Sequence, residues 1–165
     1  MIVVVMGVSG SGKTTIGTAL AARLGWSFVE GDDWHPPQNV AKMSAGTPLA
    51  DEDRFPWLDR INAELRAREA RGENVVATCS ALKQSYRDRL TRGLARWQLV
   101  FLHGSFELLS RRMAERKHRF MPASLLQSQF ATLEPPVQAI AVDVAEPLER
   151  SVDRISAALA HSRQA

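Results

Sequence analysis

Residues 7–14 of the chain read GVSGSGKT, which matches the phosphate-loop pattern G-x-x-x-x-G-K-[ST] at every fixed position. The preceding residues 2–6 are apolar and mostly β-branched, a pattern typical of a strand buried on both faces of a parallel sheet. After the loop, apolar residues recur at helical spacing as far as Leu24, and Gly25 can end that helix in a left-handed conformation. A strand, a glycine-rich loop and a helix in this order are the context that the pattern requires. The sequence therefore predicts a site for a nucleoside triphosphate.

Each part of this loop has an expected role in binding the phosphates. Its glycines allow backbone N–H groups to turn toward a polyphosphate, and the N-terminus of the helix adds positive partial charge. Lys13 is expected to reach the β- and γ-phosphates, and the hydroxyl of Thr14 to hold Mg²⁺ directly. The predicted nucleotide-binding residues are Gly7, Val8, Ser9, Gly10, Ser11, Gly12, Lys13, Thr14 and Thr15.

The composition restricts the class of protein further. With 165 residues, of which 45% are hydrophobic and 24% are charged, the chain has the size and composition of one globular domain. The net charge is only +3 and acids alternate with bases along most of the chain, so no nucleic-acid surface is expected. The single cysteine, Cys79, excludes an internal disulfide and a cysteine-based metal site, and we expect it to be a small buried residue. No apolar run is long enough to span a membrane and no signal peptide precedes the first strand, so a cytoplasmic protein is expected.

The order of the apolar runs predicts the fold. Strands are expected at residues 2–6, 26–30, 74–79, 97–102 and 139–144. Helices are expected at residues 13–24, at a short segment around 40–43, from a cap at Asp51 or Asp53 to Gly72, and at residues 80–92, 108–119, 123–133 and 148–159. Strands that alternate with helices predict an α/β fold with a five-stranded parallel sheet wrapped by helices. Residues 34–72 and 115–122 are expected to be a substrate-binding helical segment and a lid, both insertions in a single domain spanning residues 1–165.

The phosphate loop alone leaves an ATPase, a GTPase, a kinase and a nucleotide-dependent switch as alternatives. A GTPase is expected to contain the guanine-reading motif N-K-x-D, and the sequence has no such string. The second predicted strand is followed by GDDWHPP, whose acids lie beyond the carboxyl end of a strand, where open α/β sheets bind ligands. This acidic loop, the small size of the chain and a basic segment at residues 111–119 together favour a small kinase.

Three longer strings resemble the gluconate kinase (gluconokinase) family: EGDDWHPPQNVAKMSAGTPLADEDRFPWL, CSALKQSYRDRL and FMPASLLQSQFATLEPP. The resemblance extends from Gly7 to about Pro147. It implies transfer of the γ-phosphoryl group of ATP to the 6-hydroxyl of D-gluconate, a nucleoside-monophosphate-kinase-like fold, dependence on Mg²⁺ and commonly a homodimer. The alternatives are a shikimate-type or nucleotide-type kinase on the same scaffold, a nucleic-acid-binding module using residues 111–119, and a switch that binds ATP without transferring phosphate.

Phosphoryl transfer to an alcohol requires a carboxylate that accepts the proton of the hydroxyl. Asp32 is the first candidate, because it follows the second strand and matches the acid of the family's G-D-x-x-H-P block. Glu30 is expected to hold a water of the Mg²⁺ shell instead, and a solvated turn or a helix cap is the alternative role for both acids. Asp33 stands where some family members carry an apolar residue, so only a capping or solvent role is expected for it.

An anionic sugar acid requires positive groups near its carboxylate, and arginine is suited to bidentate binding. Arg54 and Arg87 are the two main candidates, and Lys83 and Tyr86 are weaker ones. The alternative for each arginine is a solvated position on the surface. His35 is expected either to donate a hydrogen bond to a gluconate hydroxyl or to hold its own loop in place.

The basic segment late in the chain has two interpretations. As a lid, it would close Arg112, Arg116 and Arg119 over the transferring phosphate as a charge clamp. As a solvated helix face it would need no function, and this interpretation suits Arg111 and Lys117. The family often reads R-K-G-H-F where this chain reads RKHRF, so the role of the family's histidine is not carried over to Arg119.

Overall fold

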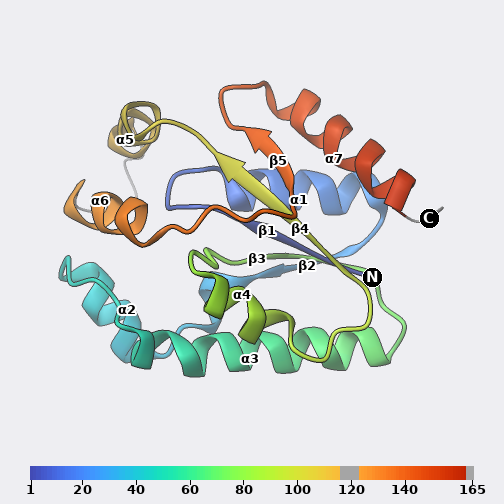
Figure 1. Ribbon diagram of the computed structural model, residues 1–165, viewed down its shortest axis with the longest axis horizontal. Helices are drawn as coiled ribbons and strands as arrows, with labels where there is room; N and C mark the ends of the chain where they lie inside the picture. Colours follow the sequence, from blue (N-terminus) through green and yellow to red (C-terminus); the bar gives the residue numbers. More distant parts are fainter. Residues whose placement is uncertain (116–122, 163–165) are drawn as a thin grey trace.

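Five parallel strands form one sheet in residues 1–115 and 123–162, the part of the chain that the computed structural model describes. The strands are β1 (Ile2–Met6), β2 (Ser27–Glu30), β3 (Val75–Thr78), β4 (Trp97–His103) and β5 (Ile140–Asp143). Their order across the sheet is β2-β3-β1-β4-β5 (Figure 1). The predicted α/β class and five-stranded parallel sheet are therefore confirmed.

The sequence of β1 explains its position at the centre of the sheet. All five of its residues are completely buried, and it pairs with β3 on one side and with β4 on the other. A strand whose side chains are apolar on both faces requires cover on both faces, and helices supply it. The phosphate loop therefore starts from a position in the middle of the molecule, where its supporting strand is held on every side.

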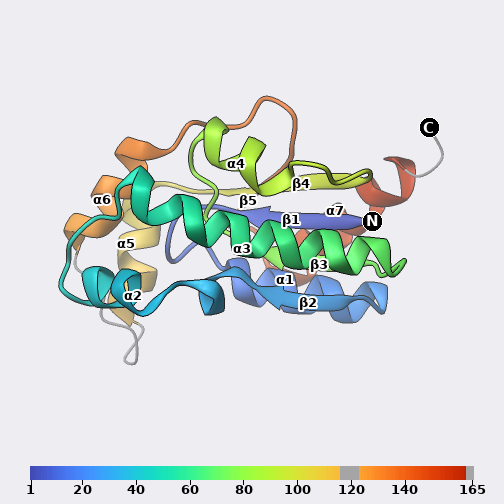
Figure 2. The same cartoon turned by 90° about the horizontal axis from the view of Figure 1, so that it is seen from below.

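The helices form two layers and a group at one end of the sheet. They are α1 (Lys13–Leu24), the 3-10 helix η1 (Gly31–Trp34), α2 (Pro37–Ser44), α3 (Asp51–Ala70), α4 (Gln84–Thr91), α5 (Phe106–Glu115), α6 (Ala123–Thr132) and α7 (Leu148–Ser162). Helices α1 and α7 pack together on one face of the sheet, and α3 and α4 pack together on the other (Figures 1 and 2). Helices α2, α5 and α6 lie at the end toward which the strands point (Figure 1). None of the helices in the described residues is long and apolar enough to cross a membrane.

The structure differs locally from the prediction in the segment after β2 and at the starts of α4 and α5. The predicted loop after β2 forms η1, and α5 begins at residue 106 rather than at residue 108. Helix α4 begins at Gln84 rather than at residue 80, because Ala81 has a positive φ of 45° and Lys83 is extended. The carbonyls of Ala81 and Leu82 accept hydrogen bonds from Arg87 Nη1, both at 3.0 Å. The buried polar groups of this non-helical segment are therefore paired without a helix.

The N-terminus of α3 is also capped differently from the prediction. Its N-cap is Ala50, whose methyl side chain cannot accept a hydrogen bond. Asp53, in the first turn, supplies the missing contact because its Oδ2 accepts the N–H of Ala50 at 2.9 Å. Asp51, the first helical residue, instead accepts hydrogen bonds from the Tyr86 hydroxyl and from Lys83 Nζ. Asp51 therefore ties α3 to α4.

Gly31 connects β2 to the acidic loop where the chain passes very close to β3. A Cβ added to Gly31 would lie 2.0 Å from the carbonyl oxygen of Thr78, so only glycine fits there. The N–H of Gly31 donates to Thr78 Oγ1 at 3.1 Å, and its carbonyl accepts from Trp57 Nε1 at 2.8 Å. These contacts determine where the next residue, Asp32, leaves the sheet.

We expect Gly31→Ala to lower the free energy of unfolding by about 3 kcal/mol or more, because the backbone of β3 cannot move away from the new methyl group. Gly72→Ala is the matched control. Gly72 has a φ of 76°, but a Cβ there would meet nothing within 4 Å, so only the backbone conformation is penalised, by about 1–2 kcal/mol. Urea unfolding midpoints of the two variants make the comparison. Equal losses would show that the close approach at Gly31 adds no cost of its own.

Candidate functional site

A cleft of about 480 Å³ opens among the phosphate loop, the η1 segment, α2, the start of α3 and α6. It brings together five residues that the sequence predicts for the site, namely Ser9, Lys13, Asp32, His35 and Arg54. An ammonium, a carboxylate, an imidazole and a guanidinium group from three separate segments of the sequence therefore share one cavity.

The phosphate loop has the backbone conformation that its glycines were expected to permit. Gly10 and Gly12 have φ angles of 79° and 88°, which side-chain-bearing residues rarely adopt. Gly12 is the residue from which α1 begins. Lys13 Nζ donates to the carbonyls of Gly7 and Val8, both at 3.1 Å, so its side chain lies back across the loop. An ammonium group in this position can neutralise phosphate oxygens held by the loop.

Thr14 and Glu30 place two oxygen-bearing side chains together beside the loop. The Thr14 hydroxyl donates to Glu30 Oε2 at 2.5 Å, and Glu30 Oε1 accepts a hydrogen bond from the Thr78 hydroxyl. Because the hydrogen of Thr14 points at Glu30, the lone pairs of its oxygen remain available to a cation. Hydroxyl and carboxylate oxygens suit Mg²⁺. The described residues contain no group of three or more acidic, histidine or cysteine side chains that could hold a metal.

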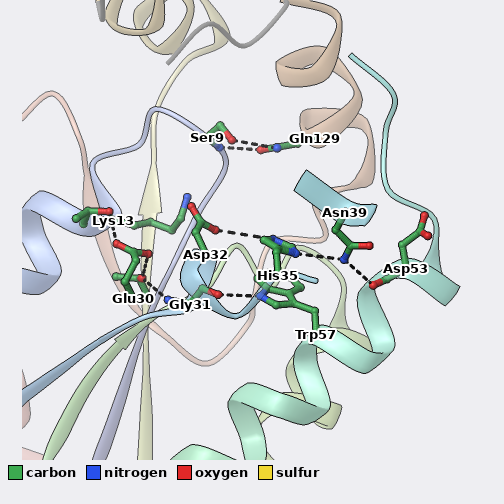
Figure 3. A network of polar contacts seen from close by, with 12 residues as sticks. Ser9, Lys13, Glu30, Gly31, Asp32, His35, Asn39, Asp53, Trp57 and Gln129 are labelled. Carbon is green, nitrogen blue, oxygen red and sulfur yellow. Dashed lines mark hydrogen bonds and ion pairs between the residues drawn. The ribbon is translucent and has the colours of Figure 1, made fainter. Parts of the chain in front are cut away.

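Asp32 and His35 face each other across part of the cleft (Figure 3). His35 Nε2 lies 4.0 Å from Asp32 Oδ1. The imidazole stacks on the indole of Trp57, with ring centroids 4.0 Å apart and 16° between the ring planes. Burial lowers the pKa of His35 to about 4, although the nearby Asp32 carboxylate acts in the opposite direction. His35 is therefore neutral near pH 7, with one ring nitrogen that donates and one that accepts.

Arg54 alone among the four predicted partners of the sugar carboxylate lines the cleft. It is 7% exposed, its Nε donates to the carbonyl of Leu49 at 3.3 Å, and its guanidinium lies 5.3 Å from the centroid of the Tyr86 ring. Its charge also helps to lower the pKa of the nearby carboxyl groups of Asp51 and Asp53. Arg54 therefore presents a positive, planar donor group to a cavity that also contains the phosphate loop.

The other three predicted partners do not line the cleft. Lys83 Nζ and the Tyr86 hydroxyl both donate to Asp51, and these hydrogen bonds hold the pKa of Asp51 below its ordinary value. Arg87 is 3% exposed, and its guanidinium donates to backbone carbonyls of the segment before α4. All three side chains thus make contacts that hold α4 and its preceding segment in place. Their role in substrate binding stays a prediction.

The predicted charge clamp is described only in part. Arg112 Nη2 donates to the carbonyl of Val144 at 2.6 Å, so this guanidinium ties α5 to the segment after β5. Arg116 and Arg119 lie outside the described residues, as does the predicted lid at residues 115–122 apart from its first residue. The role of the clamp in catalysis therefore stays a prediction.

Cys79 lies next to the site but is chemically inert. It is completely enclosed, and burial raises the pKa of its thiol to about 12. A thiol that stays protonated at neutral pH is a poor nucleophile. The structure therefore agrees with the small buried residue that the sequence predicts.

Two amide side chains contact the site although no sequence motif predicts them. Gln129 of α6 accepts the N–H of Ser9 at 2.7 Å and donates to the hydroxyl of the same residue at 3.0 Å (Figure 3). Asn39 of α2 contacts His35 and the backbone of Asp53 (Figure 3). Gln129 is 120 residues from Ser9 and Asn39 is 14 residues from Asp53, so no local spacing predicts those two contacts, whereas Asn39 and His35 are only four residues apart. The one available signal is a polar amide at a buried position of a short helix, as at Asn39.

Comparisons with known proteins identify relatives of the chain. The AAA domain family matches residues 2–136. A probable gluconokinase of Xenopus tropicalis is 47% identical over 173 residues, which cover 94% of this chain and 91% of that protein. The gluconokinase of Gluconobacter oxydans (strain 621H) is 54% identical over 133 residues, which cover 81% of this chain and 75% of that protein. The crystal structure of a gluconokinase from Sinorhizobium meliloti 1021 has a TM-score of 0.87 and 52% identity, and the match covers 96% of this chain and 91% of that one.

Proposed function

Because the chain belongs to the gluconokinase family, we propose that it transfers the γ-phosphoryl group of ATP to the 6-hydroxyl of D-gluconate, giving 6-phospho-D-gluconate and ADP. The observation that carries the proposal is the composition of the cleft. It combines the lysine of a phosphate loop, a carboxylate and a buried arginine. Such a cavity suits a phosphate donor and an anionic, hydroxyl-bearing acceptor.

Each charged group in the cleft has a distinct task in this reaction. Asp32 accepts the proton that leaves the 6-hydroxyl as the new O–P bond forms. Lys13 stabilises the negative charge on the transferring phosphoryl group. This group passes directly from ATP to the hydroxyl, without a covalent bond to the protein. Thr14 and Glu30 would hold Mg²⁺, directly and through water respectively. When bound with ATP, this ion neutralises charge on the β- and γ-phosphate oxygens.

Arg54 is the proposed partner of the gluconate carboxylate. Its planar guanidinium can donate two parallel hydrogen bonds to a carboxylate, and its burial strengthens that interaction by excluding water. His35 is the proposed donor to a gluconate hydroxyl. Lys83, Tyr86 and Arg87 are retained as supporting residues, because they hold the segments around Arg54 and Ser80 in place.

We expect Arg54→Ala to raise the KM for gluconate by about 30-fold or more and to leave the KM for ATP nearly unchanged. A buried ionic partner is lost, which costs about 2–5 kcal/mol of binding. Arg54→Lys should recover part of the affinity, because it keeps the charge but not the bidentate geometry. Steady-state kinetics with each substrate varied in turn make the measurement. An unchanged KM for gluconate would move the carboxylate site elsewhere in the cleft.

Arg87→Ala is expected to act differently, on the stability of the fold. Removing its guanidinium leaves the buried carbonyl of Ala81 without this donor, whereas the carbonyl of Leu82 keeps the N–H of Glu134 at 2.8 Å, so the loss should be about 1–3 kcal/mol of unfolding free energy. The KM for gluconate of the folded variant should change less than in Arg54→Ala. Thermal unfolding and kinetics of the two variants separate these effects. A stable Arg87→Ala protein with a strongly raised KM for gluconate would return Arg87 to the substrate site.

A coupled assay of ADP release tests the proposed reaction and its alternatives together. Release that depends on gluconate, with a product whose phosphorus resonance couples to the C6 protons, supports the proposal. Release that depends on shikimate or on a nucleoside monophosphate would support the alternative kinases on the same scaffold. ATP binding with no acceptor-dependent release would support the nucleotide-dependent switch.

We propose the remaining features of the enzyme on the family resemblance. They are dependence on Mg²⁺, a cytoplasmic location, a homodimer, and no nucleic-acid or membrane partner. The chain is proposed to be a single domain in which residues 34–72 form the acceptor-binding segment and residues 115–122 the lid. Light scattering during gel filtration measures the assembly, and omission of Mg²⁺ from the kinase assay measures the metal requirement.

A further inference from the structure

The amide group of Asn39 lies between the imidazole of His35 and the first turn of α3 (Figure 3). Asn39 Nδ2 is 2.9 Å from the carbonyl oxygen of Asp53 and 3.2 Å from His35 Nδ1. Asn39 is 1% exposed, so water does not compete for these contacts. Its position is therefore held by the backbone of one helix and by the side chain of a residue in the cleft.

These two contacts determine which nitrogen of His35 carries the proton. A backbone carbonyl only accepts hydrogen bonds, so the group of Asn39 that faces Asp53 must be its NH₂ group. The same NH₂ group faces His35 Nδ1, and an NH₂ group only donates, so Nδ1 must be the unprotonated nitrogen. In a neutral imidazole the hydrogen then resides on Nε2. Burial lowers the pKa of His35 to about 4, so the neutral form is the relevant one near pH 7.

The protonated nitrogen is the one that faces Asp32. His35 Nε2 and Asp32 Oδ1 are 4.0 Å apart, which is too long for a direct hydrogen bond. A single hydroxyl oxygen, however, can lie about 2.8 Å from both atoms at once. Such a hydroxyl would accept a hydrogen bond from Nε2–H, and its own hydrogen would be left to point at the carboxylate.

We propose that Asn39 fixes His35 as an Nε2–H donor, and that His35 and Asp32 together bind one acceptor hydroxyl in a single orientation with its hydrogen directed at Asp32. The proposal rests on the proposed kinase function, because it concerns how the acceptor alcohol is presented to its base. Asn39 is a positioning residue, since it acts through His35 and does not reach the alcohol itself.

The surrounding residues keep the spacing between the two partners constant. Trp57 stacks on the His35 ring and donates from Nε1 to the carbonyl of Gly31, the residue immediately before Asp32. One indole thus supports the donor and the carboxylate at the same time. Asn39 restrains the remaining rotation of the ring through Nδ1. The gap that would receive the alcohol is therefore set by three separate segments rather than by a flexible loop alone.

The direct test is nitrogen NMR of the wild-type protein labelled with ¹⁵N, without any substrate. Protonated and unprotonated imidazole nitrogens give well-separated chemical shifts, and His35→Gln identifies the signals of His35 among the four histidines. We expect Nδ1 to be unprotonated and Nε2 protonated near pH 7. The opposite pattern, or two protonated nitrogens, would overturn the proposal whatever the substrate of the enzyme is.

Variants then test whether the tautomer matters for catalysis. Asn39→Leu keeps the approximate size but removes the donor, and Asn39→Asp replaces the donor with an acceptor that favours a proton on Nδ1. We expect each to lower kcat by about 10–100-fold, as the loss of an orienting partner does in other sites. The KM for ATP should stay nearly unchanged, and the ¹⁵N pattern of His35 should shift. Gln38→Leu, at an exposed neighbouring position on the same helix, is the matched control and should behave as wild type.

Conservative replacement of His35 provides a second line of test if the Asn39 variants unfold. His35→Gln retains an N–H donor near the position of Nε2, whereas His35→Phe retains the ring stacking without a donor. We expect His35→Gln to keep more of kcat than His35→Phe. Equal losses in the two variants would contradict a donor role. The two proposals can fail separately. If the wild-type protein shows the expected His35 tautomer but does not phosphorylate gluconate, the proposed substrate is refuted and the assignment of the His35 proton stands.

Discussion

Lys13→Ala is expected to lower the rate of gluconate-dependent ADP formation by at least about 10²–10³-fold while leaving the protein folded. The ammonium group contacts carbonyls of the phosphate loop and not the hydrophobic core, so its removal should affect phosphate charge far more than packing. The rate is measured by the coupled ADP assay, and folding is checked by thermal unfolding of the same preparation.

Lys42→Ala is the matched control for this substitution. Lys42 also carries an ammonium group, but it pairs with Asp53 at 2.8 Å on the outside of α2 and does not line the cleft. Exposed pairs of this kind contribute about 0.2–1 kcal/mol, so only a small change in stability is expected. Near-normal turnover by a well-folded Lys13→Ala protein would remove the phosphate loop from the proposed mechanism.

Asp32→Asn is expected to lower kcat by about 10²–10⁴-fold, the usual cost of losing a general base. The amide keeps the shape and much of the hydrogen bonding of the carboxylate but cannot accept the proton of the 6-hydroxyl. ATP binding should hardly change, because Lys13 and Thr14 remain. Asp33→Asn is the matched control: it removes the same charge from the adjacent exposed residue, which also lines the cleft but has only an expected capping or solvent role, and it should retain nearly full activity.

Titration with Mg²⁺ separates a base from a ligand of the metal shell. The Glu30 carboxylate is held by the hydroxyls of Thr14 and Thr78, which suits an acid that organises the metal site. Raised Mg²⁺ should therefore recover part of the activity of Glu30→Gln and none of that of Asp32→Asn. Rescue of Asp32→Asn by Mg²⁺ would move Asp32 to the metal shell, and an unchanged kcat would exclude it from the mechanism.

The structure confirms most of what local sequence patterns predict about the fold. The bounds of β1 and α1 agree with the predicted ones, because an apolar β-branched run and an amphipathic helix depend mainly on their own residues. The predicted start of α4, residue 80, was wrong by four residues, because the helix begins at Gln84. There, the buried guanidinium of Arg87 donates to the carbonyls of residues 81 and 82, and the N–H of the distant Glu134 also donates to the carbonyl of Leu82. These contacts override the helical pattern.

The two arginines predicted for the sugar carboxylate illustrate the same limit at the site. Arg54 and Arg87 carry the same group and lie in equally specific blocks of the sequence. Only the fold directs one of them into the cleft and the other into the backbone of the segment before α4. Burial and the availability of competing acceptors decide that difference, and neither can be read from residue spacing.

The sequence by itself determined the phosphate loop, the parallel sheet that supports it and the family of the chain, because each depends on residues that are neighbours in the chain. Only the tertiary structure decided which side chains meet across the cleft. The contacts of Gln129 with Ser9 and of Asn39 with the backbone of Asp53 join segments that are separated in the sequence. The reason is physical: hydrogen bonds act over about 3 Å, and which distant groups come within that distance depends on how the whole sheet and its helices pack.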